Sequence, residues 1–392
     1  MTISKSSWPA FSEEEAAAVA EVIRSNRVNY WTGDTGRAFE REFAAWTGSA
    51  YAVALANGTL ALDVGLKALG IGVGDEVIVT PRTFIASISC VVNAGAIPVF
   101  ADVDRDSGNI NAATIAERIT ARTRAVIPVH LAGWPCDMDE IMALADRHGL
   151  AVIEDCAQAH GARVGDRSVG TIGHVGAWSF CQDKIMTTGG EGGMVTTDDR
   201  GLWEAMWSFK DHGKNWEAVY ERPHAPGFRW VHESFGTNWR MLEVQAAIGR
   251  IQLRRMAEWT ARRTHIAFAL ASAMAPFAAA VRVPMPDAGL THAFYRLYGY
   301  VRPEALTAGW TRDRIVSELV AKRVQVFHGT CSEVYLEKAF DGTQLRPAQR
   351  LPVARELGET SLMFLTHPTM TDAELKEAQR GIHEVFSEAL AR

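Results

Sequence analysis

The stretch WSFCQDKIMTTGGEGG, residues 178–193, decides how the rest of this sequence is interpreted. It places one lysine, Lys184, just before a run of small residues and glycines. Glycines beside a lysine are typical of a P-loop, but that motif needs the lysine directly after its last glycine, followed by Ser or Thr and a helix. Here the order is reversed, so the spacing excludes a P-loop. Lys184 remains a phosphate ligand, a solvated charge or a nucleophile, and the rest of the chain decides between these uses.

The composition is ordinary for a globular protein and points to neither a nucleic-acid nor a membrane partner. The chain has 392 residues, enough for two closely packed domains, and its formal net charge of −6 does not favour anionic partners. Its apolar runs are too short to span a bilayer, and the N-terminus lacks the apolar segment of a secretory signal. The five cysteines form no CxxC pair and the histidines form no metal-binding motif. We therefore expect reduced thiols, no metal and a cytoplasmic location.

Short apolar strands alternate with helices along the first half of the chain. Strands without polar alternation are expected at 51–56, 76–81, 97–104, 124–133 and 150–155. Such strands are buried on both faces, and the helices between them indicate βαβ units. Two more strands, at 177–180 and 193–198, continue the sheet around Lys184. The sequence therefore predicts an α/β fold with a mostly parallel central sheet flanked by helices.

The outer parts of the sequence predict a two-domain arrangement. An alanine-rich helix begins after Ser12, which has the form of a capping-box residue, and a long helix runs from Met241 toward Ala275. Beyond that helix the pattern is looser, with one clear strand and two helices. We therefore expect a large domain with N-terminal helices over 1–275 and a smaller α+β domain over 276–392.

Several residues with chemical potential follow the predicted strands, where ligands bind in open α/β sheets. Gly58 and Thr59 stand at the start of a helix and suit a phosphate group, although a glycine turn with a threonine cap is the alternative. Asp155 ends an apolar strand, and such a partly desolvated carboxylate needs a cation unless it caps a helix or binds a metal. No second cluster of metal ligands accompanies it. Phe84 follows another strand, and taken alone it is most simply a core residue.

A phosphate site, a carboxylate, an aromatic ring and a lysine on a short loop together match one cofactor, pyridoxal 5′-phosphate. The lysine amine forms a Schiff base with this cofactor. The carboxylate pairs with the pyridinium nitrogen, so that the ring acts as an electron sink, and the aromatic ring stacks on it. Ser179 offers a further hydroxyl for the phosphate, and the glycines after the lysine allow close approach of the backbone. The combination favours Lys184 as a nucleophile.

The sequence resembles the DegT/DnrJ/EryC1/StrS family of sugar aminotransferases over nearly its whole length. These are fold-type-I pyridoxal-phosphate enzymes of the aspartate aminotransferase superfamily. The segments that carry the resemblance are NGTLAL (57–62), TFIAS (83–87), GWPCDMDEI (133–141), IEDCAQAHGA (153–162), the lysine segment itself and GTNWRM (236–241).

The resemblance implies a role for each matching residue. Lys184 and Asp155 are implied to be the Schiff-base lysine and the partner of the pyridinium nitrogen. Asn238 is implied to reach the phosphate in the neighbouring subunit of a homodimer with two shared active sites, although an N-cap of the long helix is its simpler use. The other implied cofactor ligands contact the phosphate (Gly58, Thr59, Ser179), the ring face (Phe84) and the ring oxygen (Gln158).

Substrate contacts are predicted from three further places. The basic segment SFKDHGKN (208–215) is a candidate for the substrate pyrophosphate or a solvated loop, and the pair Tyr30-Trp31 lines the sugar pocket or packs on the surface. In the small domain, VFHGTCSEVY departs from the segment that many family members place near the sugar, which leaves the substrate open. The candidate substrate contacts from these places are Trp31, His212, Lys214 and His328, and His160 of the segment IEDCAQAHGA is a fifth candidate.

The implied reaction moves an amino group from L-glutamate to the ketone of a nucleotide-linked keto-sugar and gives an amino sugar. A keto-cyclitol acceptor remains an alternative. A sugar dehydratase of the same fold is another, but family members of that kind carry histidine in place of the Schiff-base lysine. A regulatory protein would need a DNA-binding module, and an oxidoreductase would need a GxGxxG segment after a strand; the sequence has neither.

Overall fold

A seven-stranded sheet in the order β1-β9-β8-β5-β4-β2-β3 forms the centre of the molecule. The computed structural model describes residues 7–390. Strand β9 runs antiparallel to β1 and β8, and the other neighbouring strands of this sheet are parallel. The mostly parallel sheet predicted from the sequence is therefore confirmed. Its strands are β1 (Tyr51–Leu55), β2 (Glu76–Val79), β3 (Ile97–Phe100), β4 (Thr123–Ile127), β5 (Ala151–Asp155), β8 (Val175–Ser179) and β9 (Gly193–Thr197).

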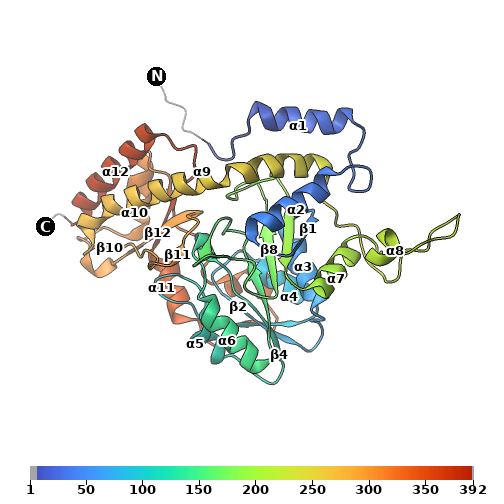
Figure 1. Cartoon of the computed structure of the whole chain (residues 1–392). Coiled ribbons are helices and arrows are strands. Elements are labelled where there is room, and N and C mark those ends of the chain that lie inside the picture. Colours follow the sequence, from blue (N-terminus) through green and yellow to red (C-terminus); the bar gives the residue numbers. More distant parts are fainter. Residues whose placement is uncertain (1–6, 391–392) are drawn as a thin grey trace.

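Helices follow most of these strands and pack around the sheet (Figure 1). Because helices cover the sheet, strand residues such as Val53, Val77 and Ile153 are fully buried, which explains why the strands lack polar alternation. The helices are α3 (Gly58–Ala68) after β1, α4 (Ala86–Asn93) after β2, α5 (Ala112–Ala116) after β3, α6 (Met138–His148) after β4 and α7 (Arg200–Lys210) after β9.

Two N-terminal helices and one long helix complete this part of the fold. Helix α1 (Glu13–Arg24) packs along α9 (Glu243–Met274), and α2 (Thr35–Thr47) packs on both β1 and α9 (Figure 1). The predicted capping box of α1 is present, since the Ser12 backbone N–H donates to Glu15 Oε2 at 2.6 Å. Helix α9 begins after Leu242, so Asn238 is not its N-cap and that simpler use is excluded.

A second, four-stranded sheet lies at the far end of α9 and has the order β10-β12-β14-β13. Its core joins Ile266 and Met274 of α9 to strand residues such as Leu362 and Phe364. The segment around Tyr335, in contrast, packs into the core of the central sheet. A domain boundary at residue 275 stays a prediction. The elements are β10 (Val281–Arg282), β12 (Arg296–Val301), α10 (Arg312–Ala321), β13 (Val326–Phe327), α11 (Pro352–Thr360), β14 (Ser361–Leu365) and α12 (Asp372–Leu390).

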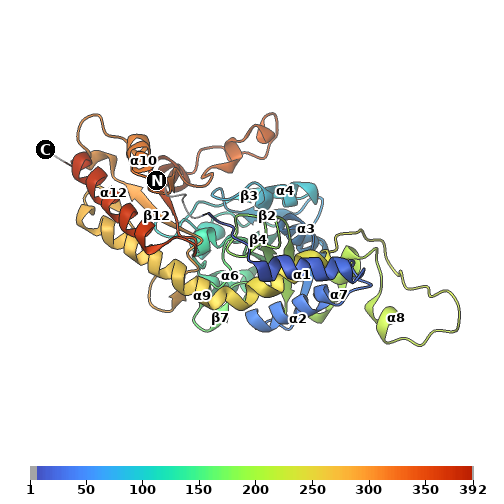
Figure 2. The ribbon, with the colours of Figure 1, turned by 90° about the horizontal axis from the view of Figure 1, so that it is seen from above.

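The chain between α7 and α9 leaves the body of the molecule. We call residues 211–242 the arm; it contains α8 (Trp216–Tyr220) and a long loop that projects away from the sheet in both views (Figures 1 and 2). A small sheet of β11 (Leu290–Thr291), β6 (Arg163–Val164) and β7 (Arg167–Ser168) joins the two larger parts. Within residues 7–390, no helix combines the length and the apolar character needed to cross a bilayer.

Candidate functional site

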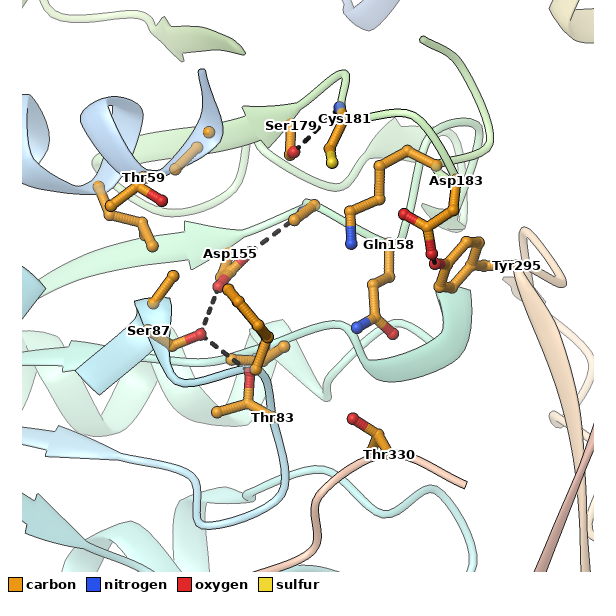
Figure 3. Close-up of a pocket in the computed structure, with 18 of the residues that line it drawn as sticks. Thr59, Thr83, Ser87, Asp155, Gln158, Ser179, Cys181, Asp183, Tyr295 and Thr330 are labelled. Atoms are coloured by element: carbon orange, nitrogen blue, oxygen red, sulfur yellow. Dashed lines mark hydrogen bonds between the residues drawn. The ribbon is translucent and has the colours of Figure 1, made fainter. Parts of the chain in front are cut away.

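A cavity of about 680 Å³ opens at the carboxyl edge of the central sheet. One wall comes from the segments that follow β1, β2, β4, β5 and β8, and the other comes from β12, β14 and the segment after β13. This is the position expected for a ligand site in an open α/β sheet. Seven of the eight predicted cofactor residues line it, namely Gly58, Thr59, Phe84, Asp155, Gln158, Ser179 and Lys184. Figure 3 labels Thr59, Asp155, Gln158 and Ser179 among them.

The start of α3 forms one end of the cavity and suits a phosphate group. The Asn57 side chain accepts from the Leu60 N–H and caps this helix, so the alternative of a threonine cap is excluded. The N–H groups of Gly58 and Thr59 belong to the first turn, where a helix has no internal acceptors for them. A Cβ atom on Gly58 would lie 2.5 Å from Ser179 Cβ, and one on Gly193 would lie 2.2 Å from the Asn57 carbonyl oxygen. Only glycines allow β8 and β9 to approach α3 this closely, which places the Ser179 hydroxyl beside the helix N-terminus.

Asp155 is held by two hydrogen bonds at the end of β5 (Figure 3). The Ser87 hydroxyl donates to Asp155 Oδ2 at 2.7 Å, and the Ala157 N–H donates to Oδ1 at 3.1 Å. The Ser87 hydroxyl has one hydrogen, and it is used in the hydrogen bond to the carboxylate. Thr83 must therefore be the donor in the 2.9 Å contact between the two hydroxyls. Neither Ser87 nor Thr83 was predicted from the sequence to belong to the site. Their signal was two hydroxyls four residues apart, a spacing that brings side chains together near a helix start.

Phe84 and Gln158 lie on the walls between these groups. The Phe84 ring is 66% exposed although it lines the cavity, so its alternative use as a core residue is excluded. Gln158 Oε1 accepts a hydrogen bond from the Ala132 N–H at 2.8 Å. This contact fixes the amide orientation, so that the amide nitrogen is the Gln158 atom that remains to donate to a ligand.

Lys184 shares the opposite end of the cavity with three residues, of which the sequence analysis named none. The Tyr295 hydroxyl donates to Asp183 Oδ2, and Lys184 Nζ lies 5.3 Å from the centre of the Tyr295 ring. The Arg296 guanidinium stacks 3.8 Å above the same ring. Burial alone would raise the pKa of Asp183, but the nearby Lys184 charge and the Tyr295 hydrogen bond lower it overall. Asp183 is therefore a stable carboxylate beside the lysine.

Four of the other predicted residues lie together at the base of the arm and not in this cavity. The fully buried Asp211 carboxylate accepts hydrogen bonds from Trp31 Nε1 and Lys214 Nζ, both at 2.9 Å. Lys214 Nζ also lies 3.8 Å from the centre of the Trp31 ring. Asn238 pairs with Asp211 through the backbone, and His212 is the next residue. Within the described chain, none of the four lines the cavity that holds Lys184.

The two remaining histidines among the predicted substrate contacts also lie outside the cavity of the described chain. His160 is fully buried against the rings of Trp178 and Phe180, and burial, followed by nearby positive charges, lowers its pKa to about 3. It is a neutral core residue that no substrate reaches. His328 faces Asp313 at 3.5 Å outside the cavity, and Thr330, two residues later, lines the cavity in its place.

One buried group in the described chain has side chains of the metal-binding type, His130, Glu154 and Cys156. Glu154 Oε1 accepts hydrogen bonds from two backbone N–H groups, and Oε2 accepts one from the Gly170 N–H at 2.8 Å. The His130 Nδ1 atom accepts from the Cys136 N–H, so its Nε2 carries the proton and donates to Glu154 at 3.0 Å. This network braces the strand end that carries Asp155. The absence of a bound metal remains a prediction.

Comparison with known proteins places the chain in a family. Residues 9–382 match the model of the DegT/DnrJ/EryC1/StrS aminotransferase family. The chain belongs to this family. A GDP-perosamine synthase of Caulobacter vibrioides is 37% identical over 365 residues, which cover 91% of this chain and 92% of that protein. A dTDP-3-amino-3,4,6-trideoxy-alpha-D-glucose transaminase of Streptomyces venezuelae is 36% identical, covering 97% of this chain and 93% of that protein.

A solved structure of an aminotransferase from Psychrobacter cryohalolentis is 61% identical to this aminotransferase. It covers 98% of this chain and 100% of its own, with a TM-score of 0.97. The cofactor of the enzyme is pyridoxal 5′-phosphate, and the cavity fits it: a helix N-terminus for the phosphate, an exposed ring for stacking, a held carboxylate and a lysine all line one space.

Proposed function

We propose that this enzyme transfers an amino group from L-glutamate to the ketone of a nucleotide-linked keto-sugar, and that it works as a homodimer with shared active sites. The observation that carries the proposal is the single cavity that gathers Lys184, Asp155 and the helix N-terminus of α3. The acceptor class is supported by the names of two near-full-length relatives, a GDP-perosamine synthase and a dTDP-aminosugar transaminase. Both names describe sugars linked to nucleotides.

Within this proposal, each residue of the cavity has one task. Pyridoxal 5′-phosphate, when bound, supplies an electron sink for the carbon that gains or loses a proton. Asp155 holds a proton on the ring nitrogen, and Ser87 keeps that carboxylate in place. Lys184 Nζ would take the proton from the amino-donor carbon and return it to the carbon on the other side of the transferred nitrogen. Phe84 would cover the ring face, and the Gln158 amide nitrogen would donate to the ring oxygen.

The arm supports the homodimer. Its exposed rings include Phe228, Trp230 and Phe235, which are 76%, 82% and 99% exposed. Large apolar side chains gathered on a projecting segment are typical of a protein contact surface. Asn238 is also exposed and lies where the arm rejoins the body. A second copy of this chain is the occupant we propose, with Asn238 reaching the phosphate in its cavity.

The charges of the cavity support a contribution from the second chain. In one chain the lining includes three carboxylates, Asp155, Asp183 and Glu191, and two cations, Lys184 and Arg296. A nucleotide diphosphate brings further negative charge and needs additional cations. Lys214 and Arg240 both donate to Asp211 Oδ1, and Asp211 pairs through its backbone with Asn238. We propose that they, with His212 and Trp31, line the substrate side of the partner's cavity.

A substrate panel tests the acceptor class. Purified enzyme with L-glutamate is offered nucleotide-linked keto-sugars and keto-cyclitols, and the amino products are identified by mass spectrometry. We expect an amino product from at least one nucleotide-linked keto-sugar, with 2-oxoglutarate formed in equal amount. Lys184→Ala is the control that should give neither product. Turnover of a keto-cyclitol alone would contradict the proposal.

We also propose a cytoplasmic location. All five cysteines are free thiols, as expected in a reducing compartment. Fractionation of cells that express the tagged chain tests this location, and recovery of the chain with secreted proteins would contradict it.

A further inference from the structure

Arg296 and Lys184 are the two cations among the described residues that line the cavity. In the proposed function Lys184 transfers the proton, so it does not serve as the binding partner of a carboxylate. Every α-amino acid that serves as an amino donor carries a carboxylate on the carbon that loses its proton. Within one chain, Arg296 is therefore the partner that such a carboxylate would meet.

The Arg296 side chain is held in place but is not saturated. Its guanidinium stacks on Tyr295, Nη1 donates to the Tyr295 carbonyl oxygen at 2.8 Å, and Nη2 lies 3.4 Å from Asp183 Oδ2. A guanidinium has five N–H groups, so these contacts leave three of them unused. The side chain is 12% exposed, so part of it remains accessible from the cavity it lines.

The nearby Asp183 forms only one long contact with this cation, 3.4 Å from Oδ2 to Arg296 Nη2. Asp183 Oδ2 already accepts the Tyr295 hydroxyl, and the contact with Arg296 is long for a charged hydrogen bond. Asp183 also lies next to Lys184 in sequence, and the Lys184 charge helps to lower its pKa after burial has acted to raise it. Asp183 and Tyr295 therefore fix the orientation of Arg296, and its free N–H groups remain for a ligand.

We propose that Arg296 binds the α-carboxylate of the amino donor. Two N–H groups of a guanidinium bind both oxygens of a carboxylate at once, which fixes the direction of the bond to the α-carbon. That fixed direction orients the α-hydrogen for transfer to Lys184. The inference rests on the proposed function only in taking L-glutamate as the donor.

Binding of an unreactive donor tests this proposal without turnover. 2-Methyl-L-glutamate has no α-hydrogen, and its α-carboxamide differs by the loss of one charge. Both ligands are titrated calorimetrically into the holoenzyme, into Arg296→Met and into Arg282→Met. Arg282 is a matched control because it stacks 4.7 Å from the centre of the Tyr300 ring on the same four-stranded sheet as Arg296, outside the cavity.

We expect the wild-type protein and Arg282→Met to bind the carboxylate about 10 to 100 times more tightly than the carboxamide, the scale of a lost hydrogen bond to a charged group. Arg296→Met should bind both ligands equally weakly. The proposal is overturned if Arg296→Met still binds the carboxylate more tightly than the carboxamide, or if the wild-type protein shows no such preference. A loss of affinity for both ligands with the preference intact also overturns it, because that result indicates only a structural role.

The absorbance of pyridoxal 5′-phosphate shows whether Arg296→Met has bound the cofactor. If it has not, Arg296→Lys tests the carboxylate contact instead, since it keeps the charge but loses the paired N–H groups. A preference reduced by about threefold or more in Arg296→Lys supports the proposal, and an unchanged preference overturns it. No sugar is present in these measurements. A wrong acceptor class therefore leaves the result unchanged, and the two proposals fail separately.

Discussion

The cavity and the arm differ in how completely one chain builds them. In the cavity, Asp155 receives two hydrogen bonds from its own chain and Asp183 receives the Tyr295 hydroxyl. In the arm, Trp230 and Phe235 expose most of their surface. The carboxylates of the cavity are therefore held by their own chain, whereas the arm leaves large apolar side chains without cover. Variants on each side should therefore behave differently.

The largest expected effect is the loss of Lys184. Lys184→Ala removes the amine that moves the proton, so turnover should fall below detection. The variant should still bind pyridoxal 5′-phosphate, because the helix N-terminus of α3 and Ser179 are unchanged. In the wild-type protein, borohydride should remove the visible absorbance and fix the cofactor to Lys184, as found by peptide mapping. A cofactor adduct on Lys210 or Lys214 instead would contradict the assignment.

Asp155→Ala should have the next largest effect. It leaves the ring nitrogen of the cofactor without its anionic partner, and we expect kcat to fall by about a hundredfold or more, the scale of a lost electrostatic contact in a dry site. The amount of bound cofactor, measured after release in alkali, should fall much less. Near-normal kcat would mean that another carboxylate supports the ring.

Ser87→Ala should have a smaller effect on the same group. It removes the 2.7 Å hydrogen bond that orients Asp155 but leaves the charge, so we expect kcat to fall by about tenfold. Ser87→Thr keeps the hydroxyl and should recover most of the activity. Ser89→Ala is the matched control, since Ser89 lies on the same helix outside the cavity and contacts only a helix carbonyl. An equal loss in Ser89→Ala would indicate damage to α4 and not to Asp155.

The cavity was more predictable from the sequence than its far wall, for a physical reason. Asp155 and Lys184 end strands or follow them, so a local pattern of apolar residues places them at the carboxyl edge of the sheet. Tyr295 and Arg296 reach the same cavity from a sheet more than a hundred positions later, and a strand pattern does not tell which of its faces meets another sheet. Their position depends on packing that the sequence does not display.

Burial was hard to predict for polar residues that lie close to a motif in sequence, because a turn of the backbone can carry them into the core. His160 follows Asp155 by five positions, yet the intervening turn carries it behind the sheet, between Trp178 and Phe180. In the basic segment at the end of α7, Lys210 is fully buried beside Asp211 and the Tyr30 ring, so charge alone did not mark the exposed residues. The exposed aromatic residues of the arm were visible only once the loop was seen to project from the body.

The smallest expected effect is a recovery of half of the activity, and it tests the comparison between cavity and arm directly. Lys184→Ala damages the cavity of its own chain, whereas Asn238→Asp places a negative charge against the phosphate of the partner's cavity if the arm is shared. Each variant alone should be inactive. Co-expression with two different affinity tags allows the heterodimer of the two variants to be isolated, which is needed because a large apolar interface exchanges slowly.

In that heterodimer, the chain with the Lys184 lesion also receives the altered Asn238 from its partner, so one site carries both lesions. The other site combines an intact Lys184 with an intact Asn238 from the opposite chain. One undamaged site should return, with up to half of the wild-type activity per heterodimer. The matched control pairs Lys184→Ala with Asp155→Ala; both lesions lie on the cavity side, each site then keeps one of them, and no activity should return. Recovery in the control as well as in the test pair would show that wild-type chains had formed by reversion or by recombination of the co-expressed genes. Absence of recovery in the test pair, with heterodimers isolated and Asn238→Asp inactive alone, would show that the arm serves its own chain and that the cavity is complete without a partner.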